Sequence, residues 1–392
     1  MSQVDEEFSL RKIAVPAFGP SILFGIAEGA LFPVIPATST SLGASLALSS
    51  LIVSIIGIGS MLANIPASIF THKFGEKIAI IGASLISALA CAIMYFIPHL
   101  AVFMLANVLI GIAQAVFNLA RQAYLTEMTP ISKRATALST LGGSYRVGVF
   151  LGPFLGAAVM HFMGVKGAYI VGFIASLVAL LIAVTLPDLV IKQKPINEST
   201  DFKYILHKNW KVFSTIGVGI MCISAMRACR QVIIPLWGHY IGLNPETVSI
   251  IYGVSASIDM LLFYPAGIVM DRFGRAWVTF PSMIVMALGF LIMPFTHGVV
   301  SLSIVAFMLG LGNGISSGLI MTLGSDYSPV AGRAKFLGIW RFMQDLGSSS
   351  GPFLVSVLTS VASLTLGVSS VGVLGLVAIA MIGYWTPRLP RK

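Results

Sequence analysis

Charged side chains are scarce in this sequence. Asp, Glu, Lys and Arg together make up 10% of its 392 residues, whereas an ordinary soluble domain carries roughly a quarter. Hydrophobic residues reach 57%, and the mean hydropathy is +0.94. A bilayer core about 30 Å thick requires roughly 20 apolar residues per helix. The composition therefore excludes most soluble folds and indicates an integral membrane protein.

Cysteine is also rare. Cys91, Cys222 and Cys229 fall inside apolar stretches and form no CxxC pair, so neither a disulfide framework nor a zinc site is expected. The sequence contains no HExxH motif and no phosphate-binding P-loop;. We therefore expect no metal, no cofactor and no enzymatic activity.

Apolar stretches separated by Gly, Pro or charge predict twelve transmembrane helices. They are expected near residues 13–36, 46–70, 78–97, 101–126, 134–161, 165–187, 211–237, 245–270, 277–296, 300–325, 333–361 and 364–386. The longest polar stretch follows the sixth of these and contains Pro195, as is typical of a linker. The sequence predicts an all-α membrane protein with two six-helix bundles, 1–188 and 211–392, joined by a cytoplasmic linker, 189–210.

The distribution of basic residues predicts the orientation in the membrane. The loops on one side, together with both termini and the linker, hold almost all of the loop Lys and Arg, and the opposite loops hold only Lys166. Because cytoplasmic loops collect Lys and Arg, we expect both termini in the cytoplasm of a multi-pass inner (plasma) membrane protein. The net charge of +10 follows from this topology, so no nucleic-acid partner is expected.

The two predicted bundles repeat one pattern. Gly148 and Gly347 lie 199 residues apart, and the same offset aligns PASIFTHKFGEK (66–77) with PAGIVMDRFGRA (265–276). It also relates Gly152 to Gly351, Pro153 to Pro352, Gly111 to Gly310, and Arg134 to Arg333. One six-helix unit therefore occurs twice in the same topology, which is typical of transporters that rock two halves about a site at the membrane midplane.

A motif in the second half carries a family resemblance. Gly267-Ile-Val-Met-Asp271-Arg272-Phe-Gly274-Arg275 resembles the motif that follows the second helix of each half in the major facilitator superfamily. With the repeat, the resemblance covers nearly the whole chain. It implies a monomer of two pseudo-symmetric six-helix bundles that carries a small molecule across the lipid bilayer by alternating access.

The resemblance also implies charge contacts at the cytoplasmic face, which we call the latch. Gly267 is expected to permit close helix approach and Gly274 a tight turn, while the acidic and basic residues form contacts that break as the halves rock. The first half departs from the motif, with His72 at the position of the Asp and Glu76 at that of the base. The expected latch residues are His72, Lys73, Gly75, Glu127, Arg134, Gly267, Asp271, Arg272, Gly274, Arg275, Asp326 and Arg333.

A glycine-proline signature lies in the fifth predicted helix. Gly148, Gly152, Pro153 and Gly156 resemble the signature of the proton-linked efflux branch of the family, and Gly351 and Pro352 repeat part of it in the second half. The same residues also suit a kinked packing seam. The fourth helix departs from the exporter pattern, because Asn107 stands where that pattern has an Arg.

Charges inside apolar helices cost at least about 2.5–3.5 kcal/mol each, so they usually face a cavity or a partner. Glu28 is the leading candidate for the proton carrier, followed by Asp345 and Asp259. The alternative is that these acids neutralise Arg146, Arg227 or Arg341 in fixed ion pairs. Arg121, near the end of its helix, is expected to snorkel or cap. The candidates for substrate binding are Arg146, Arg227, Arg230, Arg341, Tyr145 and Trp340.

The excess of Arg over acids inside the membrane favours a substrate with a carboxylate or phosphate. We therefore expect a proton-coupled exporter of a small amphipathic or anionic compound. The alternative is a proton-linked importer or facilitator of an organic anion, and a receptor or lipid-handling role on the same fold is a further alternative. The substrate, the direction and stoichiometry of coupling, and the acid that carries the proton are not determined by the sequence.

Overall fold

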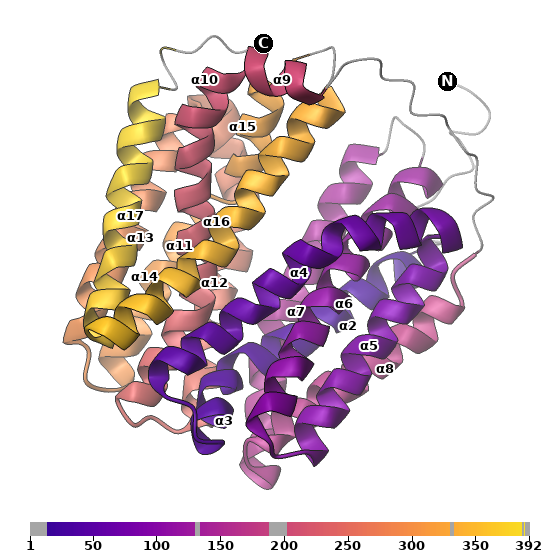
Figure 1. Ribbon diagram of the computed structural model, residues 1–392, viewed down its shortest axis with the longest axis vertical. Helices are drawn as coiled ribbons and strands as arrows, with labels where there is room; N and C mark the ends of the chain where they lie inside the picture. The colour runs from indigo at the N-terminus through magenta and orange to yellow at the C-terminus, as the bar shows by residue number, and fades with distance from the viewer. Residues whose placement is uncertain (1–13, 130–133, 188–201, 330–332, 386–387, 389–392) are drawn as a thin grey trace. The chain divides into compact units, whose positions relative to one another are not determined.

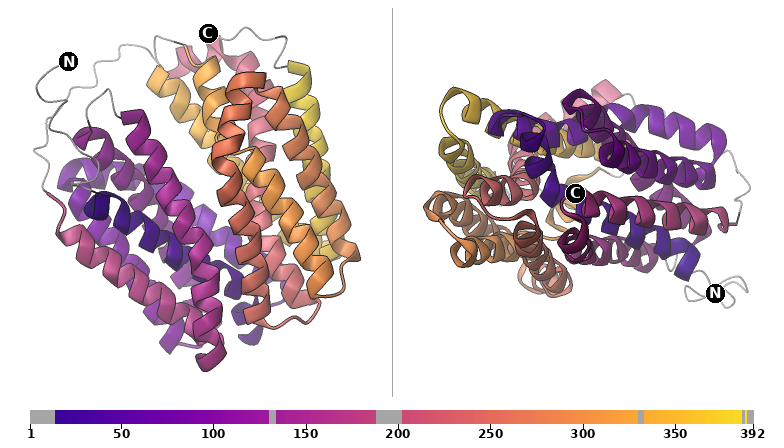
Figure 2. Two further views of the ribbon diagram at one scale, coloured as in Figure 1. Left: turned by 180° about the vertical axis from the view of Figure 1, so that it is seen from behind. Right: turned by 90° about the horizontal axis from the view of Figure 1, so that it is seen from below.

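A computed structural model describes residues 14–129, 134–187, 202–329, 333–385 and 388. All regular secondary structure in these residues is helical (Figure 1). The chain divides into two compact units. Unit 1 comprises Met1–Ser45, Ile55–Lys192 and Asn244–Gly253, and unit 2 comprises Leu46–Ser54, Gln193–Leu243 and Val254–Lys392. Figure 2 shows the helices of each unit packed side by side.

The described residues of the first half contain seven α-helices. The first, α2, passes through one 3-10 turn at Phe32–Val34 into the short helix α3. Pro33 lies in that turn and Pro36 in the first turn of α3, where a missing backbone N–H costs no hydrogen bond. The helices are α2 Ala14–Leu31, α3 Ile35–Ser41, α4 Leu46–Phe74, α5 Glu76–Phe96, α6 Leu100–Met128, α7 Arg134–Met163 and α8 Lys166–Val184.

The second half follows the same order, with differences in local structure. Its first long helix, α11 (Val218–Tyr240), runs without the break that separates α2 from α3. The second half begins with short helices and a π-helical turn at Phe213–Gly217, and its fourth long segment is interrupted at residues 316–318. The helices are α9 Phe202–Lys208, α10 Trp210–Val212, α11 Val218–Tyr240, α12 Pro245–Phe273, α13 Ala276–Ile292, α14 Val299–Ile315, α15 Leu319–Tyr327, α16 Arg333–Val361 and α17 Leu364–Trp385.

Within each unit the helices pack according to one scheme. In unit 1, α2 contacts α7 and α8, and α5 contacts α6 and α8. In unit 2, α11 contacts α16 and α17, and α13 contacts α14 and α17. The offset of 199 residues maps each of these helix pairs onto its counterpart, so the repeat seen in the sequence is also a repeat in packing.

Glycines allow the closest of these contacts. A Cβ atom on Gly148 would lie 2.0 Å from the carbonyl oxygen of Ile22, and one on Gly347 would lie 2.3 Å from that of Met221. Ile22 and Met221 are themselves 199 residues apart. Backbones that approach this closely leave no space for a side chain, as at the small-residue interfaces of membrane helices.

The rest of the glycine-proline signature lies along the same helix crossings. A Cβ on Gly152 would lie 2.5 Å from the carbonyl oxygen of Ile26, and one on Gly351 would lie 2.7 Å from that of Ala225. Pro153 is inside α7 and Pro352 is inside α16. Gly156 lies one turn beyond Gly152, where a Cβ would only touch Ala30.

Eleven segments in the described part of the chain are long and apolar enough to cross a membrane. Each of the twelve predicted stretches contains a helix, but α16, which carries Arg341 and Asp345, is not among the eleven. The span expected near 300–325 is present as Val299–Tyr327, but a turn at Ser316, Ser317 and Gly318 divides it into α14 and α15. In the expected linker, residues 189–201 lie outside the described residues, and α9 occupies part of the remainder.

Candidate functional site

The acid on α2 is buried and bound by a tyrosine. Glu28 is buried, with only 3% of its surface exposed. The hydroxyl of Tyr145, on α7, donates a hydrogen bond to its Oε2. The second oxygen, Oε1, is buried and accepts no hydrogen bond of normal geometry from the described residues. Glu28 therefore has one oxygen with a fixed donor and one buried oxygen that a proton can occupy, and the Gln114 side chain also interacts with this carboxyl.

Arg121, on α6, lies next to this pair. Its guanidinium carbon is 4.8 Å from the ring centroid of Tyr145 and 5.6 Å from that of Phe117, which is the range of a cation–π interaction. Its positive charge acts on the Glu28 carboxyl through space, and Gln114 lies beside the same carboxyl. The expectation that Arg121 only snorkels or caps is wrong, since it stacks on the tyrosine that binds the candidate proton carrier.

The polar residues of α6 share one stripe of the helix. Asn107, Gln114, Asn118 and Arg121 are spaced by seven, four and three residues, which places them on one face. Asn107 is fully buried and its Nδ2 donates to the Phe103 carbonyl oxygen at 2.8 Å. The sequence reasoning missed Gln114 and Asn118, although their helical spacing within an apolar run was a readable signal.

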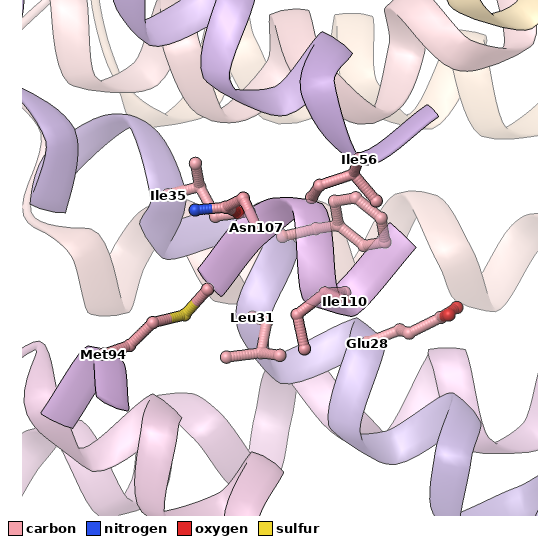
Figure 3. A pocket seen from close by; sticks show the side chains of 8 residues that line it. Glu28, Leu31, Ile35, Ile56, Met94, Asn107 and Ile110 are labelled. Atoms are coloured by element: carbon pink, nitrogen blue, oxygen red, sulfur yellow. The ribbon is translucent and has the colours of Figure 1, made fainter. Parts of the chain in front are cut away.

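A small cavity in unit 1 lies beside this stripe (Figure 3). The cavity is large enough for about one water molecule;. Figure 3 shows apolar side chains between its two polar residues, with the Glu28 carboxyl turned away from Asn107. Its lining consists of Glu28, Leu31, Phe32, Ile35, Ile56, Met94, Asn107 and Ile110. The cavity is therefore mainly apolar, and the Glu28 carboxyl faces Tyr145 instead.

Unit 2 contains a buried ion pair between α11 and α12. Arg230 is 4% exposed; its Nη2 lies 3.5 Å from Oδ2 of Asp259, and its Nη1 donates to Ser255 Oγ at 2.8 Å. Two of the predicted site residues, one a proposed substrate ligand and the other a proposed proton carrier, thus contact each other. Asp259 thus lies in an ion pair, as in the alternative, but its partner is Arg230 and not one of the three Arg residues expected there.

The interruption of the tenth predicted helix lies against another predicted site residue. Arg227 donates from Nη2 to the carbonyl oxygen of Ser316 and, at 2.9 Å, to its Oγ. Ser316 follows the last residue of α14, and Gly318 has the positive φ of 79° that ends the turn. A cation at this helix end balances the negative end of the helix dipole.

The sequence around this break also matches Gly-x-Ser-x-Gly, the pattern of a hydrolase nucleophile elbow. Gly314-Ile-Ser316-Ser-Gly318 lies between two helices, whereas the elbow requires a strand before the serine. The Ser316 hydroxyl donates to the carbonyl oxygens of Gly312 and Asn313 at 3.2 and 3.1 Å. The match is therefore a helix break and carries no catalytic geometry.

The other predicted substrate residues lie in different settings. Trp340 is 3% exposed and donates from Nε1 to the carbonyl oxygen of Ile320 at 3.0 Å, in the first turn of α15. Arg341 is exposed, while Arg146 and Asp345 are half-buried. Arg146 belongs to unit 1 and Asp345 to unit 2, and their roles in substrate binding and proton coupling stay predictions.

The latch residues of unit 2 include one strong contact. Arg275 donates from Nε and Nη2 to the two carboxylate oxygens of Asp326, at 2.9 and 3.1 Å. Arg272 is exposed. The close helix approach expected at Gly267 is wrong, because a Cβ there would meet no described atom within 4 Å. The side chains of Asp271 and Arg333 lie outside the described residues.

The latch residues of unit 1 form a different arrangement. Gly75 has a φ of 88°, close to the 93° of its counterpart Gly274, so both halves turn tightly at this point. His72, Lys73 and Glu127 are exposed, and the Lys73 ammonium lies 5.3 Å from the ring centroid of Phe74. The side chain of Arg134 lies outside the described residues.

Comparison with known proteins supports a family assignment. The family model described as Major Facilitator Superfamily matches residues 21–228 and 216–392. Among curated relatives, the uncharacterized MFS-type transporter YfkF of Bacillus subtilis is 26% identical over 274 residues, which cover 68% of each chain. The multidrug resistance protein MdtG of Escherichia fergusonii is 24% identical over 378 residues, covering 92% of this chain and 90% of that protein.

Solved structures share the fold at low identity. A bacterial homolog of the human lysosomal transporter Spinster, in an inward-facing and unoccupied conformation, superposes with a TM-score of 0.78 at 13% identity and covers 95% of both chains. A D-xylose–proton symporter gives a TM-score of 0.75 at 15% identity, covering 97% of this chain and 98% of the other. At these identities the likeness shows the fold alone.

Proposed function

The chain belongs to the major facilitator superfamily of membrane transporters, and from this premise we propose that it is a proton-coupled exporter of a small amphipathic or anionic compound. Within this proposal, twelve helices form two six-helix bundles, 1–188 and 211–392, that open alternately to the two sides of an inner membrane. Both termini and the linker lie in the cytoplasm, and the protein acts as a monomer. Transport by a multi-pass membrane protein follows from the family and makes an enzyme role unnecessary.

The observation that carries the proposal is the buried carboxyl of Glu28. An acid inside a membrane helix is expensive unless it faces a partner or performs a function. Here Tyr145 binds one oxygen, the other has no donor of normal geometry in the described residues, and Arg121 lies against the tyrosine ring. Such a carboxyl can gain and lose a proton as its neighbours move.

Two observations support export as the direction. The curated relative that covers 92% of this chain is named a multidrug resistance protein, and another, from Lactococcus lactis, is named a multi-drug resistance efflux pump homolog. The glycine-proline signature of the efflux branch lies at the crossing of α2 and α7, with Gly148 against Ile22. A rigid seam between the helix that carries Glu28 and its neighbour would keep the acid in place while the halves move.

A second candidate function is a proton-linked importer or facilitator of an organic anion. Asn107 stands on α6 where the exporter pattern has an Arg, and its side chain is fully buried and donates within its own helix. The membrane helices also contain more Arg than acids, which suits an anionic solute.

An imposed pH gradient tests the direction. Purified protein in proteoliposomes is given an inside-acid or an inside-alkaline lumen, and uptake of ethidium and of naphthalenesulfonate is measured against protein-free vesicles. If the protein exchanges solute for protons, the solute accumulates inside the vesicles only when the lumen is acid. This holds for both orientations of the protein in the vesicle membrane. Accumulation only with an alkaline lumen would establish the importer instead, and accumulation that ignores the gradient would establish a facilitator.

A further inference from the structure

Three side chains from three helices of unit 1 form one chain of contacts: Glu28 on α2, Tyr145 on α7 and Arg121 on α6. We infer that Tyr145 is a positioning residue that joins Glu28 and Arg121 into one coupled unit, in which an anionic group that binds Arg121 is accompanied by a proton on Glu28. A cationic group that binds Glu28 displaces that proton. The inference rests on the proton coupling proposed above and links its sign to the charge of the solute.

The two carboxyl oxygens of Glu28 have different surroundings. Oε2 of Glu28 accepts the Tyr145 hydroxyl, and this bond is compatible with either protonation state because the tyrosine is the donor. Oε1 is buried without a hydrogen bond of normal geometry. The proton therefore resides on Oε1, arriving from and returning to water, while Tyr145 keeps its own proton.

The positive charge of Arg121 lies among aromatic rings. The Arg121 guanidinium lies within cation–π distance of two rings, those of Tyr145 and Phe117. Phe117 in turn stacks on Phe24 of α2, with ring centroids 4.1 Å apart and an interplanar angle of 6°. The cation therefore lies against the ring whose hydroxyl binds the acid. A movement of Arg121 must therefore disturb the ring whose hydroxyl binds Glu28.

Among the described residues, Arg121 is the charged group that acts on Glu28. The helices that pack on α2 are α6, α7 and α8. From α6 the charge that acts on Glu28 is Arg121, and from α7 the Tyr145 hydroxyl binds it. The half-buried Arg146 is also on α7, but it is not among the groups that act on this carboxyl. After its first residue, Lys166, α8 has no charged residue, and its Tyr169 hydroxyl is engaged by Thr38.

The coupling has a definite sign. When a carboxylate or phosphate group draws Arg121 away, Glu28 loses its nearby positive charge, and a buried carboxylate without a counter-charge takes up a proton. Anion and proton then move together, which is the behaviour of a symporter. An ammonium group at Oε1 competes with the proton for the same oxygen, which is the behaviour of an antiporter. Of the proposed export solutes, an exporter that uses Glu28 in this way therefore carries the amphipathic ones with a cationic or zwitterionic group. An anionic solute that is coupled through Arg121 belongs to the importer alternative.

Infrared difference spectroscopy of the protein in lipid tests the unit without any ligand. The carboxylic acid band that disappears in Glu28→Gln is followed against pH in the parent, in Tyr145→Phe, in Arg121→Gln and in the double variant. Each single variant should keep the acid form to a higher pH than the parent, by about one pH unit, the size of one hydrogen bond to a charged group. The double variant should show clearly less than the sum.

Tyr169→Phe is the matched control, because it also removes a buried hydroxyl from unit 1 that is hydrogen-bonded to a neighbouring helix. It should leave the Glu28 band at the pH of the parent. Additive shifts, no shift in Tyr145→Phe, or an equal shift in Tyr169→Phe would overturn the inference.

The pH profile of transport separates this inference from the proposed function. If transport is proton-coupled but Tyr145→Phe leaves both its pH profile and the Glu28 band unchanged, the inference fails and the proposed function stands. If the band shifts as expected but no solute flux responds to a pH gradient, the coupled unit stands and the proposed function fails.

Discussion

Arg275 and Asp326 form a two-point ion pair, with both carboxylate oxygens bound by one guanidinium at 2.9 and 3.1 Å. The offset of 199 residues relates these two residues to Glu76 and Glu127. In unit 1 the corresponding positions therefore hold two acids, and the negative charge of Glu76 acts on Glu127. Unit 2 therefore has an attractive pair of opposite charges at these two positions, whereas unit 1 has two negative charges that repel each other.

Glu76→Arg should convert the repulsion into a counterpart of the Arg275–Asp326 pair. Because Glu127 is exposed, the gain in the free energy of unfolding should be modest, up to about 1 kcal/mol. The thermal unfolding midpoint of the purified protein in detergent measures it. Glu76→Gln, which removes the repulsion without adding an attraction, is the control. A stability of Glu76→Arg at or below that of Glu76→Gln would show that the two positions do not meet as their counterparts do.

Arg275→Gln should destabilise unit 2. Both partners of the pair are largely buried, with side-chain exposures of 21% and 18%, and charged hydrogen bonds are worth about 1.5–3 kcal/mol. The exchange Arg275→Asp with Asp326→Arg should recover part of the loss, since it restores opposite charges. Thermal unfolding of the single and double variants compares the three. A double variant as unstable as the sum of its single changes would contradict the pairing.

Gly148→Ala should disrupt the crossing of α2 and α7. Its Cβ would lie 2.0 Å from the Ile22 carbonyl oxygen, and overpacking of this kind costs at least about 1–3 kcal/mol. Gly142→Ala on the same helix is the control, because a Cβ there meets nothing within 4 Å and alanine is the better helix former. Folded yield and unfolding midpoint should fall for Gly148→Ala only. Equal behaviour of the two variants would mean that the seam is looser than described.

The same test applies to the repeated seam in unit 2. Gly347→Ala places a Cβ 2.3 Å from the Met221 carbonyl oxygen, whereas Gly338→Ala on the same helix meets nothing within 4 Å. The pair of variants should reproduce the difference seen in unit 1. A tolerant Gly347 beside an intolerant Gly148 would show that the two halves do not share this packing requirement.

Arg227→Lys should weaken the break between α14 and α15 while retaining the charge. Both hydrogen bonds to Ser316 come from one guanidinium nitrogen, Nη2, and the shorter lysine side chain carries its charge on a compact ammonium that does not reach the same position. Proteolysis or hydrogen exchange around residues 313–319 should therefore increase in the variant. Ser316→Ala, which removes only the Oγ contact, should have a smaller effect. Unchanged exchange in Arg227→Lys would assign Arg227 to some other role, such as the predicted binding of substrate.

The sequence was sufficient for the helices and for their repeated packing. The apolar runs and the offset of 199 residues predicted the twelve helical stretches, and the glycines aligned by the offset lie at equivalent crossings, as Gly111 against Ile56 and Gly310 against Ser255 show. These features are local or periodic, so hydropathy and subtraction suffice to find them.

The break after Ile315 and the position of Arg121 were not found in this way. Ser316, Ser317 and Gly318 interrupt a stretch whose hydropathy stays high, because the break depends on the positive φ of Gly318 and on Arg227 from another helix. Arg121 was judged by its distance from the end of the helix, whereas its surroundings depend on which face of α6 meets Tyr145. Such contacts join distant parts of the chain, and residue spacing within one helix does not specify them.

Proton movement by the reconstituted protein tests the central claim most directly. A pH-sensitive dye inside the proteoliposomes reports proton flux when ethidium or naphthalenesulfonate is added, in the parent, in Glu28→Gln and in Glu246→Gln, which removes a carboxylate from the start of α12. The account predicts solute-dependent proton movement in the parent and in Glu246→Gln, and its loss in Glu28→Gln. Full proton movement in Glu28→Gln would contradict it and would assign the proton to Asp259 or Asp345.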